Sequence, residues 1–216
     1  TQLAFHNLLH PFQPVIIGQR IIGPKIASKF GINIVMNGEN KAEYGNKIEE
    51  NKKPSMDNDF FCTEEPMTMK FGGVTMREII EKYGFSKSDF SPYIPPTEDE
   101  IKNKDIEVHY LGYYLRWDPQ ECYYYAVENT GFKPNTERTQ GSYSKYSSID
   151  DKIDPFHYFT TLMKFGIGRA TYDACQEIRN GKITREEGVH LVKKYDQEFP
   201  DIFFKEFLQY IDTTEE

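Results

Sequence analysis

The chain has 216 residues, of which 38% are hydrophobic and 28% are charged, so it can form a packed core in one large or two small domains. The net charge of −8 argues against nonspecific nucleic-acid binding, which needs a basic surface. No apolar run approaches the roughly 20 residues that a membrane span requires. The cysteines at 62, 122 and 175 have neither zinc nor disulfide spacing, which predicts a cytoplasmic protein.

The first segment is predicted to contain a helix, a strand and a loop. Residues 14–30 are apolar enough for a helix, in which Gly18 and Gly23 either weaken the helix or allow close packing against a sheet. Residues 32–36 are predicted to form a buried strand that leads into a Gly-rich, acidic loop over 37–45. Such a loop marks the carboxyl edge of an open parallel α/β sheet, where these sheets bind ligands.

The rest of the chain changes from mixed to helical. The sequence predicts a long polar insertion or lid over residues 46–66, followed by two short helices over 75–83 and 97–102. A second strand over 108–114 and a longer helix over 118–130 come next. After a polar loop, the sequence predicts four helices. Three of them cover residues 155–165, 169–180 and 200–210, and the other begins at the capping box formed by residues 184–187. We therefore expect an α/β part over 1–148 and a helical region over 149–216.

The loop after the first strand holds a first cluster of candidate site residues, Gly38, Glu39, Asn40 and Glu43. Glycine lets the backbone approach a ligand, and the carboxylates can hold a magnesium ion or a ribose hydroxyl. The plainer interpretation is a strand-to-helix turn with a capping acid. Spacing alone does not separate the two interpretations.

A second group, the loop cluster, consists of Tyr146, Asp150 and Asp151. A polar loop followed by carboxylates can hold a cation or a sugar. Composition alone favours the alternative, which is a solvated loop and a helix cap.

A third group consists of Lys164, Gly166, Gly168 and Arg169, at the predicted start of a helix. Two glycines between cations at a helix N-terminus can form an anion site. A tight turn between two helices explains the glycines equally well. His157 lies close by in sequence, but without metal-ligand spacing it is interpreted as structural.

Four stretches together resemble a known family. They are Asn-Gly-Glu-Asn at 37–40, His-Tyr-Leu-Gly-Tyr-Tyr at 109–114, Ser-Ser-Ile-Asp-Asp-Lys-Ile-Asp at 147–154 and Lys-Phe-Gly-Ile-Gly-Arg-Ala-Thr at 164–171. In this order they resemble the N-acetyl sugar amidotransferases of the WbpG and PseA type, from lipopolysaccharide and nonulosonic-acid biosynthesis. The last two stretches are the most specific.

The resemblance implies an ATP pyrophosphatase domain of the PP-loop (adenine nucleotide alpha-hydrolase) type, of which this chain would hold the back half of the open parallel sheet. It further implies that ATP and Mg²⁺ activate the acetamido oxygen of a sugar nucleotide or nonulosonic acid. Ammonia from a separate glutaminase would then convert the acetamido group to acetamidino.

The resemblance also implies roles for the candidate residues. The first cluster would bind the nucleotide and magnesium, with Glu43 as metal ligand and catalytic residue. Lys164 is the second catalytic candidate, and Gly166, Gly168 and Arg169 would contact a phosphate or sugar anion. From residue chemistry, and not from the family pattern, we expect the loop cluster to lie near the acceptor sugar.

The family's phosphate loop, Ser-Gly-Gly-x-Asp-Ser, and its N-terminal cysteine pairs do not occur in this sequence, which starts at Thr1. We therefore expect a truncated chain that is inactive alone and belongs to an active longer enzyme, with a homo-oligomer left open. One alternative is a non-catalytic scaffold that docks the glutaminase. A weaker alternative is a sulfur-transferring PP-loop enzyme acting on tRNA, against which the acidic charge counts.

Overall fold

The chain divides into two compact units in the computed structural model, which describes residues 1–38 and 52–215. The strand unit comprises Gln13–Trp117, and the helical unit joins Thr1–Phe12 to Asp118–Glu216. These units are defined by compactness. The predicted boundary between an α/β part (1–148) and a helical part (149–216) is a different division, and it stays a prediction.

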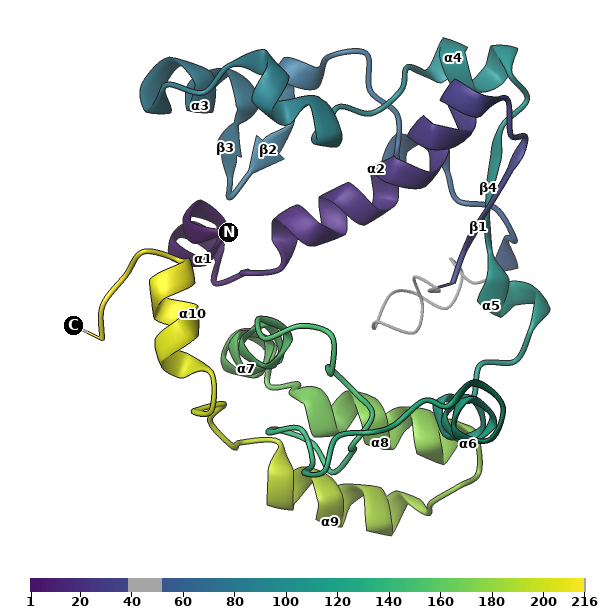
Figure 1. Cartoon of the computed structure of the whole chain (residues 1–216), viewed down its shortest axis with the longest axis vertical. Coiled ribbons are helices and arrows are strands. Elements are labelled where there is room, and N and C mark those ends of the chain that lie inside the picture. Colours follow the sequence, from purple (N-terminus) through teal and green to yellow (C-terminus); the bar gives the residue numbers. More distant parts are fainter. Residues whose placement is uncertain (39–51, 216) are drawn as a thin grey trace. The chain divides into compact units, whose positions relative to one another are not determined.

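A small parallel sheet forms the centre of the strand unit, which confirms the predicted α/β class. Strands β1 (Ile34–Asn37) and β4 (Glu107–Tyr110) pair in parallel, with Val35 opposite Val108 (Figure 1). The second strand was predicted to continue to residue 114. It ends at Tyr110 instead, because β1 ends at the partner position, and the following residues form helix α5 (Leu111–Tyr114).

Helix α2 (Gln13–Phe30) covers one face of this sheet, as predicted for residues 14–30. A Cβ added to Gly23 would lie 2.8 Å from Cγ1 of Val35, so this glycine permits the close packing that was one of its two predicted roles. The prediction of a buried strand was wrong, because no residue of β1 is buried and Val35 and Asn37 are only half-buried. Ile34 and Met36 are 54% and 48% exposed, because strand alternation directs them away from α2.

An apolar cluster stabilises the strand unit, with Met56, Phe61, Ile101, Ile106 and Val108 as its main members. Met56 and Phe61 lie within the polar stretch predicted as a lid, so its described part contributes to the core. The remaining elements are the hairpin β2 (Lys70–Phe71) and β3 (Val74–Thr75), the short helices η3 (Asn58–Phe60), η4 (Pro66–Thr68) and η5 (Lys87–Tyr93), and α3 (Met76–Tyr83) and α4 (Glu98–Asn103).

The helical unit confirms the predicted helical C-terminal region. Its described helices are α1 (Gln2–Leu8), α6 (Pro119–Thr130), α7 (Asp154–Phe165), α8 (Arg169–Arg179), α9 (Arg185–Tyr195) and α10 (Phe204–Tyr210) (Figure 1). Phe156, Phe207 and Ile211 form a buried apolar cluster between α7 and the C-terminal segment. Across residues 1–38 and 52–215, no helix has the length and apolar character needed to cross a membrane.

Candidate functional site

The carboxyl edge of the parallel sheet is present in the strand unit. Gly38 directly follows β1, and the register places Asn37, the last residue of β1, opposite Tyr110, the last residue of β4. Both strands therefore end at the same edge, which is where open α/β sheets bind ligands. Of the first cluster only Gly38 can be placed there, since Glu39, Asn40 and Glu43 lie outside the described residues.

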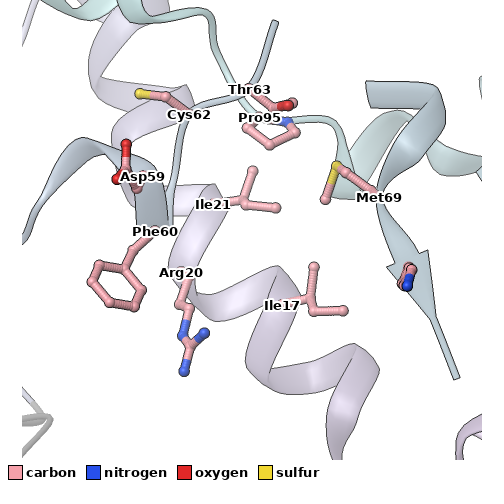
Figure 2. Close-up of a pocket in the computed structure, with 10 residues that line it drawn as sticks. Ile17, Arg20, Ile21, Asp59, Phe60, Cys62, Thr63, Met69 and Pro95 are labelled. Carbon is pink, nitrogen blue, oxygen red and sulfur yellow. The ribbon is translucent and has the colours of Figure 1, made fainter. Parts of the chain in front are cut away.

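The strand unit also contains an open cavity of about 270 Å³ that the sequence did not predict (Figure 2). Ile17 and Ile21 project from α2 and, with Met69, make its wall apolar, while Arg20 and Lys70 add two cations. Burial, followed by the nearby carboxylates, raises the pKa of Cys62 in this cavity to about 11. This thiol therefore stays protonated at neutral pH and is a poor nucleophile.

In the helical unit, Arg169 is held between two carboxylates. Its Nε donates to Oδ1 of Asp173 at 3.1 Å, and its Nη1 lies 3.4 Å from Oδ2 of Asp154. The guanidinium carbon lies 4.4 Å from the ring centre of Tyr158, a cation–π distance. The side chains of Arg169, Asp154 and Asp173 are only 13–17% exposed. The arginine predicted to meet a phosphate is thus neutralised by carboxylates of its own chain.

Asp150 and Asp151 of the loop cluster precede Asp154, one of the two carboxylates that hold Arg169. Burial raises the pKa of Asp154, opposed by Arg169 and assisted by the negative charges of Asp151 and Asp150. The Asp151 carboxylate accepts a hydrogen bond from the Asp154 amide at 3.2 Å, at the start of α7. Asp151 therefore serves as a helix cap, while Asp150 is exposed to solvent.

Tyr146 lies in a tyrosine-rich and acidic environment. Its ring stacks on Tyr123 with centres 4.4 Å apart and planes at 12°. Burial, then the charges of Glu177 and Asp173, raise its pKa to about 12, and burial raises the pKa of Glu177 as well. We call Tyr123, Tyr143, Tyr146, Asp173 and Glu177 the Tyr146 surface. Aromatic faces beside hydrogen-bond acceptors suit a sugar, which has apolar C–H faces and hydroxyl donors.

One hydroxyl of the Tyr146 surface lacks a partner. Burial and the neighbouring carboxylate of Glu177 raise the pKa of Tyr143, yet its buried hydroxyl makes no well-aligned hydrogen bond to the described residues. Buried polar groups are normally satisfied by protein, water or a ligand. This hydroxyl is buried beside the Glu177 carboxylate, so it is not open to a ligand at the surface of the unit.

The two-glycine turn is already occupied by a carboxylate of the chain. Asp196 accepts hydrogen bonds from the amides of Gly168 and Thr171, both at 3.0 Å, and it is 6% exposed. Gly166 ends α7 in the left-handed conformation, at φ 72°. The N-terminus of α8 thus satisfies its amides internally, and an external anion at Gly168 would have to displace Asp196.

Lys164 lies beside the stacked rings of His10 and His157. We call Lys164, His10, His157 and Arg169 the basic group. The rings of His10 and His157 stack with centres 5.0 Å apart, and the buried Nδ1 atoms of both lack a described hydrogen-bond partner. Burial, then the charges of His10, Lys164 and Arg169, lower the pKa of His157 to about 4. Lys164 itself donates to the carbonyl of Leu8 at 3.2 Å. Because Arg169 is already paired with Asp154 and Asp173, Lys164 is the cation of this group that can meet an anion.

The structure therefore unites Lys164 and Arg169 around His157, which sequence spacing had assigned a structural role only. It also shows an anchor that the sequence analysis missed. Arg138 makes two hydrogen bonds of 2.6 Å to the Glu198 carboxylate, and fixes the loop that carries Tyr146. The partners are 60 residues apart, so no local spacing indicates them. Among the described residues, no group of three or more His, Cys, Asp or Glu is arranged for a metal ion.

Comparison with known proteins finds one matching family. Residues 140–216 match the family described as LPS biosynthesis protein WbpG-like, C-terminal domain. This span includes Tyr146, Lys164 and Arg169, and it runs from the polar loop through α10. No curated protein matches the chain.

Proposed function

Because residues 140–216 match the family described as LPS biosynthesis protein WbpG-like, C-terminal domain, we propose that the chain is part of an ATP-dependent sugar amidotransferase. The reaction converts the acetamido group of a sugar to acetamidino, in O-antigen or nonulosonic-acid biosynthesis in the cytoplasm. The family match carries this proposal. The Tyr146 surface and the basic group support it, because both lie largely within the matched residues.

The strand unit is proposed to be the back half of a PP-loop domain. Its parallel sheet and the position of Gly38 at the carboxyl edge support this assignment. ATP would supply the activation that turns the amide oxygen into a leaving group, so that ammonia from a partner glutaminase can displace it. The described residues offer no complete magnesium site, so the proposed metal ligand remains Glu43, outside the described residues.

The helical unit is proposed to bind the acceptor. The stacked ring of Tyr146 provides a face for the sugar, and the Glu177 carboxylate accepts its hydroxyl hydrogens. Lys164 and His157 are proposed to meet the negative charge of a sugar nucleotide or nonulosonic acid. Burial is the main cause of the low His157 pKa, and binding an anion there would offset the smaller contribution of the neighbouring positive charges.

Calorimetric titration with Mg-ATP tests the enzymatic part of the proposal. The titrations use the 216-residue chain and a version extended upstream to include the phosphate loop. We expect binding only to the extended protein, because the residues here complete a site whose phosphate cradle lies elsewhere. Absence of binding to both would refute the amidotransferase mechanism and favour the docking scaffold.

Titration with a nucleoside-diphosphate N-acetyl sugar tests the acceptor site. Tyr146→Ala is expected to weaken binding about fivefold, since the loss of one stacked aromatic contact is worth about 1 kcal/mol. Tyr125→Ala is the matched control, because this tyrosine is 67% exposed on α6. Equal affinities of the two variants would exclude the Tyr146 surface as the acceptor site.

A further inference from the structure

A chain of hydrogen bonds links three side chains of the strand unit, Glu107 and His109 on β4 and Tyr114 on α5. Nε2 of His109 lies 2.6 Å from Oε2 of Glu107, and its Nδ1 lies 2.6 Å from the hydroxyl oxygen of Tyr114. The rings of His109 and Tyr114 are almost parallel, with planes at 6° and centres 5.9 Å apart. Both nitrogens of the imidazole are therefore engaged, one by a carboxylate and the other by a phenol.

The strand pattern explains why these groups meet. Val108 and Tyr110 are buried in the core of the unit, so strand alternation places Glu107 and His109 together on the outer face of the sheet. β4 ends at Tyr110 and α5 follows at once (Figure 1), so the Tyr114 hydroxyl reaches back to His109. Tyr114 thus follows the carboxyl end of β4, at the edge where open α/β sheets bind ligands.

The carboxylate sets the direction of both hydrogen bonds. An ionised carboxylate only accepts, so Nε2 of His109 carries a proton and donates it to Glu107. In the neutral ring Nδ1 then has a lone pair, which accepts a hydrogen bond from the Tyr114 hydroxyl. The phenol proton is directed at a base, and a carboxylate behind the base holds it in one tautomer. This order of groups is the one that activates a hydroxyl.

The surroundings of His109 favour proton transfer along these bonds. Its side chain is only 13% exposed, and its partner on β1 is the uncharged Met36. The segment that bridges to β4 on the other side carries Lys53 and Asp57, which pair with each other at 3.5 Å. Among the described residues, the charge within hydrogen-bond distance of the ring is therefore that of Glu107. It stabilises the imidazolium that forms when Nδ1 receives a proton.

Tyr114 is the member of this group that a ligand can reach. It is 49% exposed, and its oxygen keeps lone pairs after the hydroxyl has donated to His109. The bond between Tyr114 and His109 would be enough to hold α5 to β4. The carboxylate on the far nitrogen of the ring adds what a proton relay requires, which is a fixed tautomer and a countercharge.

We propose that Tyr114 is the general base of the amidotransferase reaction, with His109 and Glu107 as its relay; this inference rests on the proposed function. When the ammonia nitrogen forms its bond to the amide carbon, the bond from that carbon to the activated oxygen breaks, and its electron pair leaves with the oxygen. The nitrogen keeps two of its protons and loses the third. Tyr114 takes this proton on its oxygen and passes its own proton to Nδ1 of His109, while Glu107 stabilises the imidazolium.

Acetylation of the 216-residue chain by N-acetylimidazole tests the relay without any enzymatic activity. A phenol whose proton is taken by a neighbouring base reacts faster, so Tyr114 should be acetylated at least about tenfold faster than Tyr83, as measured by peptide mass spectrometry. Tyr83 is the matched control, because it lies in the same unit and is 56% exposed. The excess should shrink in Glu107→Gln and disappear in His109→Gln. A Tyr114 that reacts no faster than Tyr83, or whose excess survives His109→Gln, overturns the proposal.

Kinetics of the extended protein, with ammonium as the nitrogen source, test the role of Tyr114 in the reaction. Tyr114→Phe should lower kcat about 100-fold with little change in KM for the acceptor sugar, because the phenol acts on the nitrogen and does not hold the sugar. Glu107→Gln should show the same split with a smaller loss of kcat. Tyr113→Phe is the control, because this neighbour is 47% exposed and its ring contacts Tyr114 with centres 5.3 Å apart. Equal kcat values of Tyr114→Phe and Tyr113→Phe overturn the proposal.

These outcomes are separable from those of the proposed function. Fast acetylation of Tyr114, in a protein whose extended form makes no acetamidino sugar, would keep the relay and overturn its role as the base for ammonia together with the proposed function. Turnover by an extended protein whose Tyr114 reacts like Tyr83 would keep the amidotransferase and overturn the relay.

Discussion

Both units contain a buried apolar cluster, but the helical unit adds a largely buried ionic network. In the helical unit, Arg169 bridges Asp154 and Asp173 in a largely buried position, and the carboxylate of Asp196 holds the start of α8. In the strand unit, the buried cluster around Phe61 is apolar. Apolar packing tolerates exchange of similar side chains, whereas a buried ionic group depends on each of its members.

The ionic network makes the helical unit the better place to hold the side chains of a binding site in fixed orientations. Hydrogen bonds and ion pairs are directional, so the network around Arg169 and the Arg138–Glu198 pair fix the orientation of nearby groups. The Tyr146 surface lies beside this network and shares Asp173 with it. The strand unit instead exposes apolar side chains at Ile34 and Met36 of β1.

The largest effect is expected from Arg169→Ala. The substitution leaves the carboxylates of Asp154 and Asp173 buried without their cation, which costs about 3 kcal/mol or more of unfolding free energy. Ile101→Val in the apolar cluster should cost only about 1 kcal/mol. Urea unfolding of both variants and of the exposed control Arg185→Ala measures the difference. Similar losses for Arg169→Ala and Arg185→Ala would show that the ionic network does not stabilise the unit.

The second largest effect concerns the pH dependence of the helical unit. The pKa of His157 is lowered from 6.5 to about 4 in the folded chain, chiefly by burial. Its contribution to stability is therefore complete above pH 6.5 and is lost as the pH falls from 6.5 toward 4, because the unfolded state binds the proton first. The loss amounts to on the order of 3 kcal/mol.

Urea unfolding of the wild type and of His157→Phe between pH 7 and pH 4 checks this expectation. The variant should lose less stability on acidification, while His190→Phe, at an exposed position of α9, should follow the wild type. Parallel pH profiles of wild type and His157→Phe would contradict the burial of a neutral imidazole.

Local sequence rules located most helices, because the residues that begin and end a helix act on their immediate neighbours. The predicted ends of α3 at Gly84 and of α6 at Asp118 and Gly131 are confirmed, and the structure adds a capping box at Thr75. The second strand was predicted too long, because its length depends on β1, which ends at Asn37. Strand pairing is a property of two distant segments, and one segment does not reveal it.

The candidate site shows the same limit. The anion site predicted at Gly168 followed correct local chemistry, but Asp196, which is 28 residues away, supplies the anion. Burial of His157 depends on His10, which comes from the other end of the chain. The i,i+4 spacing of Arg169 and Asp173 on α8 was the one local pattern that could have indicated the ionic network.

A smaller effect on stability is expected from replacing the two glycines of α2 by alanine, with opposite signs at Gly23 and Gly18. Gly23→Ala should destabilise the strand unit by about 1–3 kcal/mol, because its Cβ would lie 2.8 Å from Cγ1 of Val35. At Gly18 the nearest atom to an added Cβ is 3.6 Å away, on Tyr93, so Gly18→Ala should stabilise the helix by about 0.5–1 kcal/mol. Thermal unfolding measures both. Stabilisation by Gly23→Ala would show that α2 does not pack closely on β1.

The smallest effect tests whether helix capping contributes equally in the two units. Thr97 caps α4 in the strand unit and Thr184 caps α9 in the helical unit, and each accepts a 3.2 Å hydrogen bond from the amide three residues later. Replacing either threonine by alanine should cost about 1 kcal/mol in urea unfolding. Thr97→Ser and Thr184→Ser keep the hydroxyl and should retain most of the stability.

Because a capping bond is local, the two alanine variants should lose similar amounts of unfolding free energy, although only the helical unit contains the ionic network around Arg169. A loss several times larger for Thr184→Ala would mean that the polar network extends to α9 and couples its cap to Arg169.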